Sequence, residues 1–341
     1  MKKNALKVLV LCMVFILVMP LLFSAGGTEA KPKKEVIIFA SVFNPGQPQV
    51  TTQHKFKELF EERSNGKYEV RVITSAAMGG AREHLEAMQE GSIHLVASGP
   101  EGTAIFNPTY DVENIPFLFE DWDHLYRYLD GEPGKIITQK ILDTLGVRNL
   151  GYQVRGARQL TADRPVYSRD DLKGLRMRLS ETEPLLRIWG AVGASPLPIA
   201  FNELYTALQT KMVRAQENPV ETIYGQKFYE VQDYMMETDH VLTISYFQAS
   251  EKWFKTLSDA DRNLLLECMK EAIAYGNDIA VNSIDKLKKE IVDNGWMTII
   301  PRDQIDIDSI RIPALAEVEK MVAEGKYDQK LYQMALDLKK K

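Results

Sequence analysis

The chain has 341 residues, 45% of them hydrophobic, and a formal net charge of −5. A net-negative chain argues against nucleic acid as the partner, because phosphate binding requires a basic face. The length exceeds what one hydrophobic core usually serves, so we expect two lobes.

The N-terminus has the pattern of a secretory signal peptide. Lys2, Lys3 and Lys7 precede an apolar run over 8–23, and small residues follow it. This order is typical of a cleaved export signal, and the run is shorter than the roughly 20 residues of a membrane span. We therefore expect residues 1–25 to be removed and the mature protein to be periplasmic. Retention as an uncleaved anchor is the alternative.

The first part of the remaining chain alternates between strands and helices. Apolar spacing and the turn residues that end each run predict strands at 35–41, 68–74 and 93–97 and helices at 51–63 and 79–90. Alternation at this spacing favours a parallel sheet with helices on both faces.

Polar residues follow two of these strands. Ligands of such sheets bind beyond the carboxyl ends of the strands. Ser41, Asn44 and Ser98 occupy those positions, so they are candidate ligand-binding residues.

The second half repeats the pattern. Strands are expected at 149–154 and 175–179, and helices at 181–191 and 200–210. A much longer helical pattern covers 258–294 without a proline. A helix of this length is unusual within one compact domain, so we expect it to run across both lobes.

Two arginines and an amide-rich segment form the candidate site. Arg158 and Arg178 follow or end predicted strands, and an expected turn contains Glu217 and Asn218. The stretch 156–219 has no serine, cysteine or histidine placed as a nucleophile or base. Glu217 is interpreted as non-catalytic, because no histidine or second carboxylate is evident near it. Fixed cations without a reacting group indicate a site that holds an anion unchanged.

Arg178 is the stronger candidate for anion binding, because a guanidinium fork matches a carboxylate with two parallel hydrogen bonds. Arg158 could instead brace a hinge, and Asn218 could be ordinary turn chemistry. We expect Phe201 to line the pocket and Trp189 to lie in the core.

Four runs resemble the solute-binding proteins of TRAP transporters (tripartite ATP-independent periplasmic transporters). These runs are 171–178, 200–209, 216–219 and 227–231. The resemblance extends from about Glu35 to near Gln333. It implies two α/β lobes, joined by hinge strands and a long helix, that close around a small organic anion.

The resemblance also implies roles for individual residues. Arg178 matches the arginine that pairs with the ligand carboxylate, and Arg158 matches a second arginine that supports it. Asn218 matches an asparagine that contacts the ligand or orients that arginine, and Phe201 matches an aromatic residue that packs on the ligand. The implied partners are the membrane subunits of the transporter, driven by an ion gradient, and no cofactor or metal is expected.

Three places depart from the family pattern. Arg214 and Ala215 replace an Asp-Gly pair, and Leu179-Ser180 follows the key arginine where a proline is common. The glutamate that often follows the third strand in sialic-acid-binding members is displaced, to Glu101. These differences leave the substrate open.

The sequence therefore predicts an α/β, two-lobe periplasmic binding protein fold. Lobe I is expected over 32–155 plus 244–283, and lobe II over 156–243 plus 284–337. We expect a monomer without enzymatic activity that captures a small organic acid, either a sugar acid or a C4-type carboxylate. A sensory binding protein and an exported enzyme acting on an organic acid are the alternatives.

Overall fold

The computed structural model describes residues 34–339. Within them the strands are β1 (Glu35–Ser41), β2 (Tyr68–Ile73), β3 (Leu95–Ser98), β4 (Val147–Ala162), β5 (Arg176–Leu179), β6 (Ser195–Pro198), β7 (Ala215–Pro219), β8 (Tyr234–Met236), β9 (Leu242–Ser250) and β10 (Thr298–Ile300). The α-helices are α2 (Pro48–Arg63), α3 (Ala81–Glu90), α4 (Glu101–Ala104), α5 (Trp122–Leu129), α6 (Glu132–Leu145), α7 (Arg169–Leu172), α8 (Glu183–Ala191), α9 (Leu204–Gln209), α10 (Val220–Gly225), α11 (Glu251–Phe254), α12 (Asp259–Asp293), α13 (Ile307–Ala323) and α14 (Gln329–Asp337). Short 3-10 helices include η2 (Val112–Asn114) and η3 (Phe201–Glu203).

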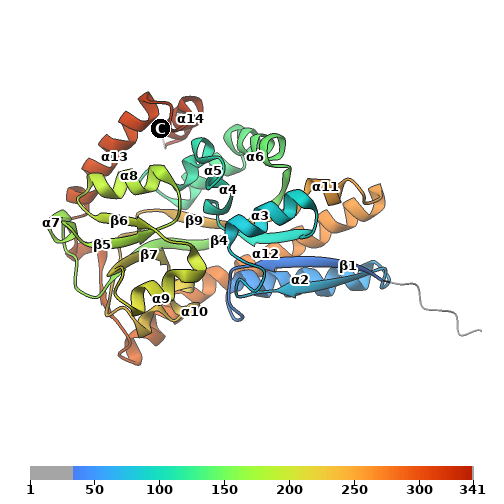
Figure 1. Ribbon diagram of the computed structural model, residues 1–341, viewed down its shortest axis with the longest axis horizontal. Helices are drawn as coiled ribbons and strands as arrows, with labels where there is room; N and C mark the ends of the chain where they lie inside the picture. The colour runs from blue at the N-terminus through green and yellow to red at the C-terminus, as the bar shows by residue number, and fades with distance from the viewer. Residues whose placement is uncertain (1–33, 340–341) are drawn as a thin grey trace, which may run out of the picture. The chain divides into compact units, whose positions relative to one another are not determined.

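Strand β4 belongs to both halves of the sheet, whose order is β2-β1-β3-β9-β4-β7-β5-β6. The first part of β4, as far as Ala157, pairs with β9. Its last part, from Arg158 to Ala162, pairs with β7 and, in part, with β8. The two lobes of this α/β fold are therefore linked by a continuous strand, which Figure 1 shows passing from one group of strands to the other.

The sheet is mixed, so the prediction of a parallel sheet is wrong in part. Strand β1 pairs in parallel with β3, and β5 with β6 and β7. Strands β3 and β4, however, both pair antiparallel with β9, and β4 is antiparallel to β7. The alternation of strands and helices indicates only how consecutive strands are connected. Strand β9 enters the sheet from much later in the chain, and its direction is independent of that rule.

The long helix is confirmed as α12, which spans 35 residues. Ser258 caps it by accepting a hydrogen bond from the backbone N–H of Asp261 at 3.1 Å. Helix α12 packs on α2, β4 and α10. Gly276 allows the close approach, since a Cβ there would lie 1.8 Å from Oγ1 of Thr52 and 3.0 Å from Nε2 of Gln153.

Other elements agree with the sequence to within a few residues, with three exceptions. The strand expected at 149–154 is the much longer β4, which runs from Val147 to Ala162. The expected turn at 216–219 is part of strand β7, and the expected helix at 200–210 is η3 followed by the shorter α9. Trp189 is 2% exposed and lies in the core, as expected. The predicted signal peptide, 1–25, lies outside the described residues. No helix within 34–339 is long and apolar enough to cross a membrane.

The C-terminal helix α14 packs on α6 and α5. Nε2 of His124 in α5 lies 2.7 Å from the backbone oxygen of Ala335 in α14. The lobe boundaries, 32–155 plus 244–283 and 156–243 plus 284–337, stay predictions.

Candidate functional site

Strands β4, β5 and β7 bring the predicted site residues together. Arg158 lies opposite Pro219 in the pairing of β4 with β7, next to Asn218. Arg178 is on β5, which pairs with β7. The three polar side chains are all buried, with 7%, 4% and 2% of Arg158, Arg178 and Asn218 exposed.

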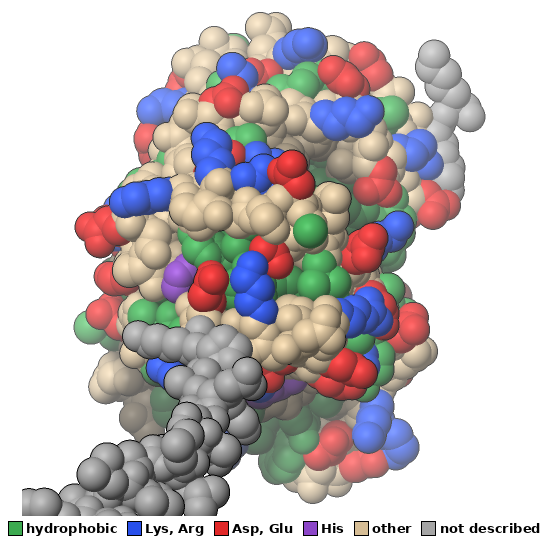
Figure 2. All heavy atoms as spheres, turned by 90° about the vertical axis from the view of Figure 1, so that its right-hand side faces the viewer, with side chains coloured by type: hydrophobic (Ala, Val, Ile, Leu, Met, Phe, Trp, Pro, Cys, Tyr) green, Lys and Arg blue, Asp and Glu red, His purple; other side chains and the backbone are tan. Residues whose placement is uncertain are grey.

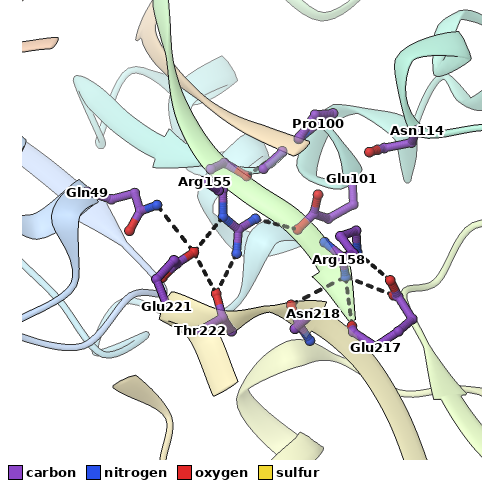
Figure 3. A network of polar contacts seen from close by, with 12 residues as sticks. Gln49, Pro100, Glu101, Asn114, Arg155, Arg158, Glu217, Asn218, Glu221 and Thr222 are labelled. Carbon is purple, nitrogen blue, oxygen red and sulfur yellow. Dashed lines mark hydrogen bonds and ion pairs between the residues drawn. The ribbon is translucent and has the colours of Figure 1, made fainter. Parts of the chain in front are cut away.

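Arg158 is paired with Glu217. Its Nε forms an ion pair with Oε2 of Glu217, and its Nη2 donates to Oε1 of Glu217 at 2.8 Å and to the Glu217 backbone oxygen at 2.9 Å. Nη2 also donates to Oδ1 of Asn218 at 3.3 Å. Figure 3 shows Arg158 held between these two residues. The positive charge of Arg158 is therefore matched by the protein itself.

His240 completes this cluster. Its Nε2 lies 2.9 Å from Oε2 of Glu217, and its Nδ1 lies 2.8 Å from Oγ1 of Thr238. The ionised carboxylate of Glu217 can only accept, so Nε2–H of His240 donates to it. The interpretation that no histidine lies near Glu217 is wrong, because the loop between β8 and β9 places His240 beside it.

The pKa of Glu217 is low despite its burial. Burial alone would raise this pKa, but the charge of Arg158 and the hydrogen bonds from His240 and Arg158 outweigh it and lower the pKa to about 2. Glu217 is therefore an ionised counter-ion with its oxygens occupied, which makes it a poor proton acceptor near neutral pH.

Arg178, unlike Arg158, is held by a backbone oxygen rather than by a carboxylate. Its Nε donates to the backbone oxygen of Ile199 at 2.8 Å, and its guanidinium lies 5.8 Å from the ring centre of Phe201. Within residues 34–339 no carboxylate forms an ion pair with it, in contrast to the buried Arg155 and Arg158. Burial lowers the pKa of Arg178 to about 10. The negative charge of Glu217 raises this pKa and the positive charge of Arg158 lowers it, but burial has the largest effect. Arg178 is thus a buried cation that no carboxylate of the described residues pairs with.

Arg155, on β4, belongs to the polar network next to these residues, and the sequence reasoning missed it. It is 1% exposed, and its Nε donates to Oε1 of Glu221 at 2.9 Å while Nη2 donates to Thr222 Oγ1 at 2.7 Å. Its Nη1 lies 3.6 Å from Oε1 of Glu101, as Figure 3 shows. The signal in the sequence was Gly156, whose φ of +110° accompanies a register shift between β4 and β9 at this point.

A small cavity of about 20 Å³ borders Arg158 and Glu217. The residues that complete its lining come from four further parts of the chain, and they are Glu101, Asn114, Ser180, Leu185 and Val241. Ser180 directly follows the strand that carries Arg178. The cavity therefore lies beside Arg158 and beside the end of the strand that carries Arg178.

The other three predicted ligand-binding residues use their side chains elsewhere. Asn44 Nδ2 donates to the backbone oxygen of Gly225 at 3.1 Å and to Gln226 Oε1 at 3.0 Å. The hydroxyl of Ser41 donates to Gln53 Oε1 at 2.8 Å, and that of Ser98 to the Gly99 backbone oxygen at 3.1 Å. None of the three borders the cavity. Their role in binding stays a prediction, as do the roles of Arg158, Arg178, Asn218 and Phe201.

Side chains that could bind a metal ion are not clustered in the described part of the chain. Over the described range, no group of three or more His, Cys, Asp or Glu side chains is placed to hold a metal ion. The polar groups of the site are arginines, amides and ion-paired glutamates, which suit an organic anion rather than a metal.

Comparisons with known proteins identify the family. The model of the bacterial extracellular solute-binding protein family 7 matches residues 39–325. The C4-dicarboxylate-binding periplasmic protein DctP of Shewanella loihica is 32% identical over 261 residues, which is 76% of this chain and 76% of that protein.

Solved structures agree with this match. A TRAP periplasmic solute-binding protein of Shewanella oneidensis with bound succinate has a TM-score of 0.85 and 29% identity, and the match covers 90% of this chain and 100% of that one. Another, from Roseobacter denitrificans with bound L-galactonate, has a TM-score of 0.83 and 25% identity, covering 90% and 99%. With its mixed sheet, its long helix α12 and its family match over most of its length, this chain belongs to bacterial extracellular solute-binding protein family 7, the solute-binding proteins of TRAP transporters.

Proposed function

We propose that this protein captures a small organic acid, either a sugar acid or a C4-type carboxylate, outside the cytoplasm and delivers it to a TRAP transporter. The observation that carries the proposal is the state of Arg178. It is a buried guanidinium with one nitrogen fixed to Ile199 and no carboxylate partner within residues 34–339. A ligand carboxylate would supply the missing counter-ion.

The surrounding residues favour a fixed anion site. Arg158 is locked by Glu217, so it contributes geometry and positive potential rather than a free charge. Asn218 is held from both sides, since its Oδ1 accepts from Arg158 and its Nδ2 donates to Gln216 Oε1 at 2.6 Å. Side chains that are already ordered lose little further entropy when a ligand binds.

A binding role fits better than a catalytic one. The histidine and the glutamate of the site are hydrogen-bonded to each other, and Glu217 has a pKa lowered to about 2. Neither group is left free as a base for a substrate proton. The two similar structures described above contain succinate and L-galactonate, both small carboxylates.

Ligand entry would require the lobes to open. The cavity of about 20 Å³ is far smaller than the roughly 300 Å³ of a small ligand pocket. Side-chain contacts connect segments that the sequence assigns to different lobes, since Gln47 Nε2 donates to Glu221 Oε2 at 2.7 Å and Asn44 bonds to Gln226. Hinge motion that breaks and remakes such contacts is the expected mechanism of capture.

The proposed partners are the ligand and the membrane subunits of the transporter, with the mature chain acting as a periplasmic monomer. On the face in Figure 2, lysine and arginine side chains are intermixed with aspartate and glutamate, so that face offers no continuous basic surface for a nucleic acid.

A thermal-shift screen of carboxylic and sugar acids tests the proposal. A ligand that binds only the folded state stabilises it by about 2.7 kcal/mol at 100 times its Kd. We expect at least one acid to raise the melting temperature of the wild type and to do so far less for Arg178→Lys. Arg176→Lys, an exposed change on the same strand, is the matched control. Equal shifts in all three proteins would refute Arg178 as the carboxylate partner.

A further inference from the structure

The charges around the cavity do not cancel evenly. Arg158 is paired with Glu217, and Arg155 with Glu221 at 2.9 Å. Two of the charged side chains in this region have no hydrogen-bonded partner of opposite charge among the described residues, and they are Arg178 and Glu101. Glu101 forms a longer ion pair with Nη1 of Arg155, at 3.6 Å and without a hydrogen bond, while Nε and Nη2 of Arg155 bond to Glu221 and Thr222. The charge of Arg155 is therefore balanced mainly by Glu221, and its Nη1 has no hydrogen-bond partner among the described residues.

Glu101 lines the same cavity as Arg158 and Ser180. It is the first residue of α4, and its side chain folds over Gly99, where a Cβ would come within 2.2 Å of Glu101 Oε2. This oxygen is buried and has no hydrogen-bond partner among the described residues. The carboxylate therefore retains accepting capacity within the site.

Asn114, on η2, lines the same cavity. Its Nδ2 already donates to Oδ1 of Asp111 at 2.8 Å. Its amide oxygen can only accept, as can the carboxylate of Glu101. Figure 3 shows both residues on the same side of Arg158. This side of the cavity is consequently rich in acceptors. Of the nearby arginines, Arg155 and Arg158 are each paired with a glutamate, whereas no described carboxylate forms an ion pair with Arg178.

We infer that the ligand is a polyhydroxy monocarboxylate, a sugar acid, and that Glu101 is the residue that selects it against dicarboxylates. The inference rests on the proposed function and narrows it to one of its two ligand classes. One carboxylate neutralises Arg178, and hydroxyl groups along the rest of the ligand donate to Glu101 and Asn114. Hydrogen bonds from hydroxyls to a carboxylate are short and strong because the acceptor is charged.

A second carboxylate on the ligand would be repelled rather than bound at this end of the site. It would lie near Glu101 without an unmatched cation, and two like charges in a site of low dielectric disfavour each other. Rejection of a competing ligand by an unpaired or repelling group is a common source of specificity. The inference therefore predicts that the protein prefers monocarboxylates to dicarboxylates, and that replacing Glu101 with a neutral residue weakens this preference.

Calorimetric titration of wild type and Glu101→Gln tests this with acids matched in carbon number. D-erythronate is paired with succinate and tartrate, and L-galactonate with galactarate. We expect the wild type to bind one of the monocarboxylates at least tenfold more tightly than its matched dicarboxylates. In Glu101→Gln we expect this ratio to fall at least tenfold, because glutamine removes the repulsion. Glu90→Gln, an exposed residue on α3, makes the same change in net charge and should leave the ratio unchanged.

The possible failures are distinguishable. If the wild type binds a dicarboxylate more tightly through Arg178, or if Glu101→Gln leaves the ratio within twofold, this inference is wrong and the proposed carboxylate site stands. If the wild type binds neither class, both are wrong. Thermal unfolding of Glu101→Gln verifies folding, and Glu101→Asp, which keeps the charge, should retain the preference for the monocarboxylate.

Discussion

Replacing Arg178 with methionine should increase the stability of the ligand-free protein and strongly weaken ligand binding. Arg178 is 4% exposed, and burial lowers its pKa from the ordinary 12.5 to about 10. The folded state therefore disfavours the charged form relative to the unfolded chain, and the charged side chain reduces stability at every pH below about 10. At about 1.4 kcal/mol per pKa unit, the penalty is about 3 kcal/mol.

The substitution also removes one favourable contact. Nε of Arg178 donates to the backbone oxygen of Ile199 at 2.8 Å, and losing such a hydrogen bond costs about 1 kcal/mol. Methionine keeps an apolar stem to pack beside Phe201. The expected net gain in the free energy of unfolding is about 2 kcal/mol. The ligand would lose two charge-assisted hydrogen bonds of about 1.5–3 kcal/mol each, so Kd should rise by roughly a hundredfold or more.

Urea unfolding of protein freed of ligand by denaturation and refolding measures the first effect, and calorimetry measures the second. Arg176→Met, at an exposed position of β5, is the control. If Arg178→Met is destabilised by more than about 1 kcal/mol while the control is neutral, or if it binds the ligand within about twofold of wild type, then Arg178 is not an unmatched anion-binding cation.

Three further predictions follow from the same contacts. Arg158→Ala should destabilise the protein by about 3–5 kcal/mol in urea unfolding, because it leaves Glu217 charged and buried without its partner; a loss below about 1 kcal/mol would contradict the ion-pair assignment. Burial raises the pKa of Glu113 from 4.5 to about 7, so the stability that this group contributes is complete below pH 4.5 and is lost as the pH rises to about 7. Relative to wild type, Glu113→Gln should therefore gain about 3 kcal/mol across that range in urea unfolding, and parallel pH profiles would refute the shift. Ligand binding should reduce the radius of gyration in small-angle scattering, and an unchanged radius despite saturation would contradict closure.

The sequence predicted those parts of the fold that depend on local patterns. The run at 35–41 is strand β1 with the expected limits, and the uninterrupted helical pattern at 258–294 is α12 within one residue at each end. Both signals come from neighbouring residues, namely apolar spacing and the cap at Ser258. The parallel sheet was a wrong extension of the same reasoning, since the direction of β9 depends on a return of the chain that local spacing does not describe.

In the candidate site, too, the sequence indicated some residues and missed those whose position depends on long-range strand pairing. Arg158, Arg178 and Asn218 were singled out from the sequence, and the structure brings them together. Arg155 and His240 were not. Arg155 is next to Gly156 at a register shift, which changes the face on which a strand presents its side chains. His240 meets Glu217 only through the pairing of β4 with β7 and β8, which no short motif reveals.

Arg178 also has a consequence for the medium in which the protein works. A guanidinium without a carboxylate partner among the described residues attracts any anion that reaches it. If the proposed site is correct, chloride and phosphate compete there with the organic acid before the proposed closure of the lobes. The planar fork favours a carboxylate over a spherical ion, but the extent of the competition depends on the anions in the surrounding solution. The affinity that matters for uptake is therefore a property of the protein and its surroundings together. Apparent Kd should increase when chloride replaces a bulky anion at constant ionic strength.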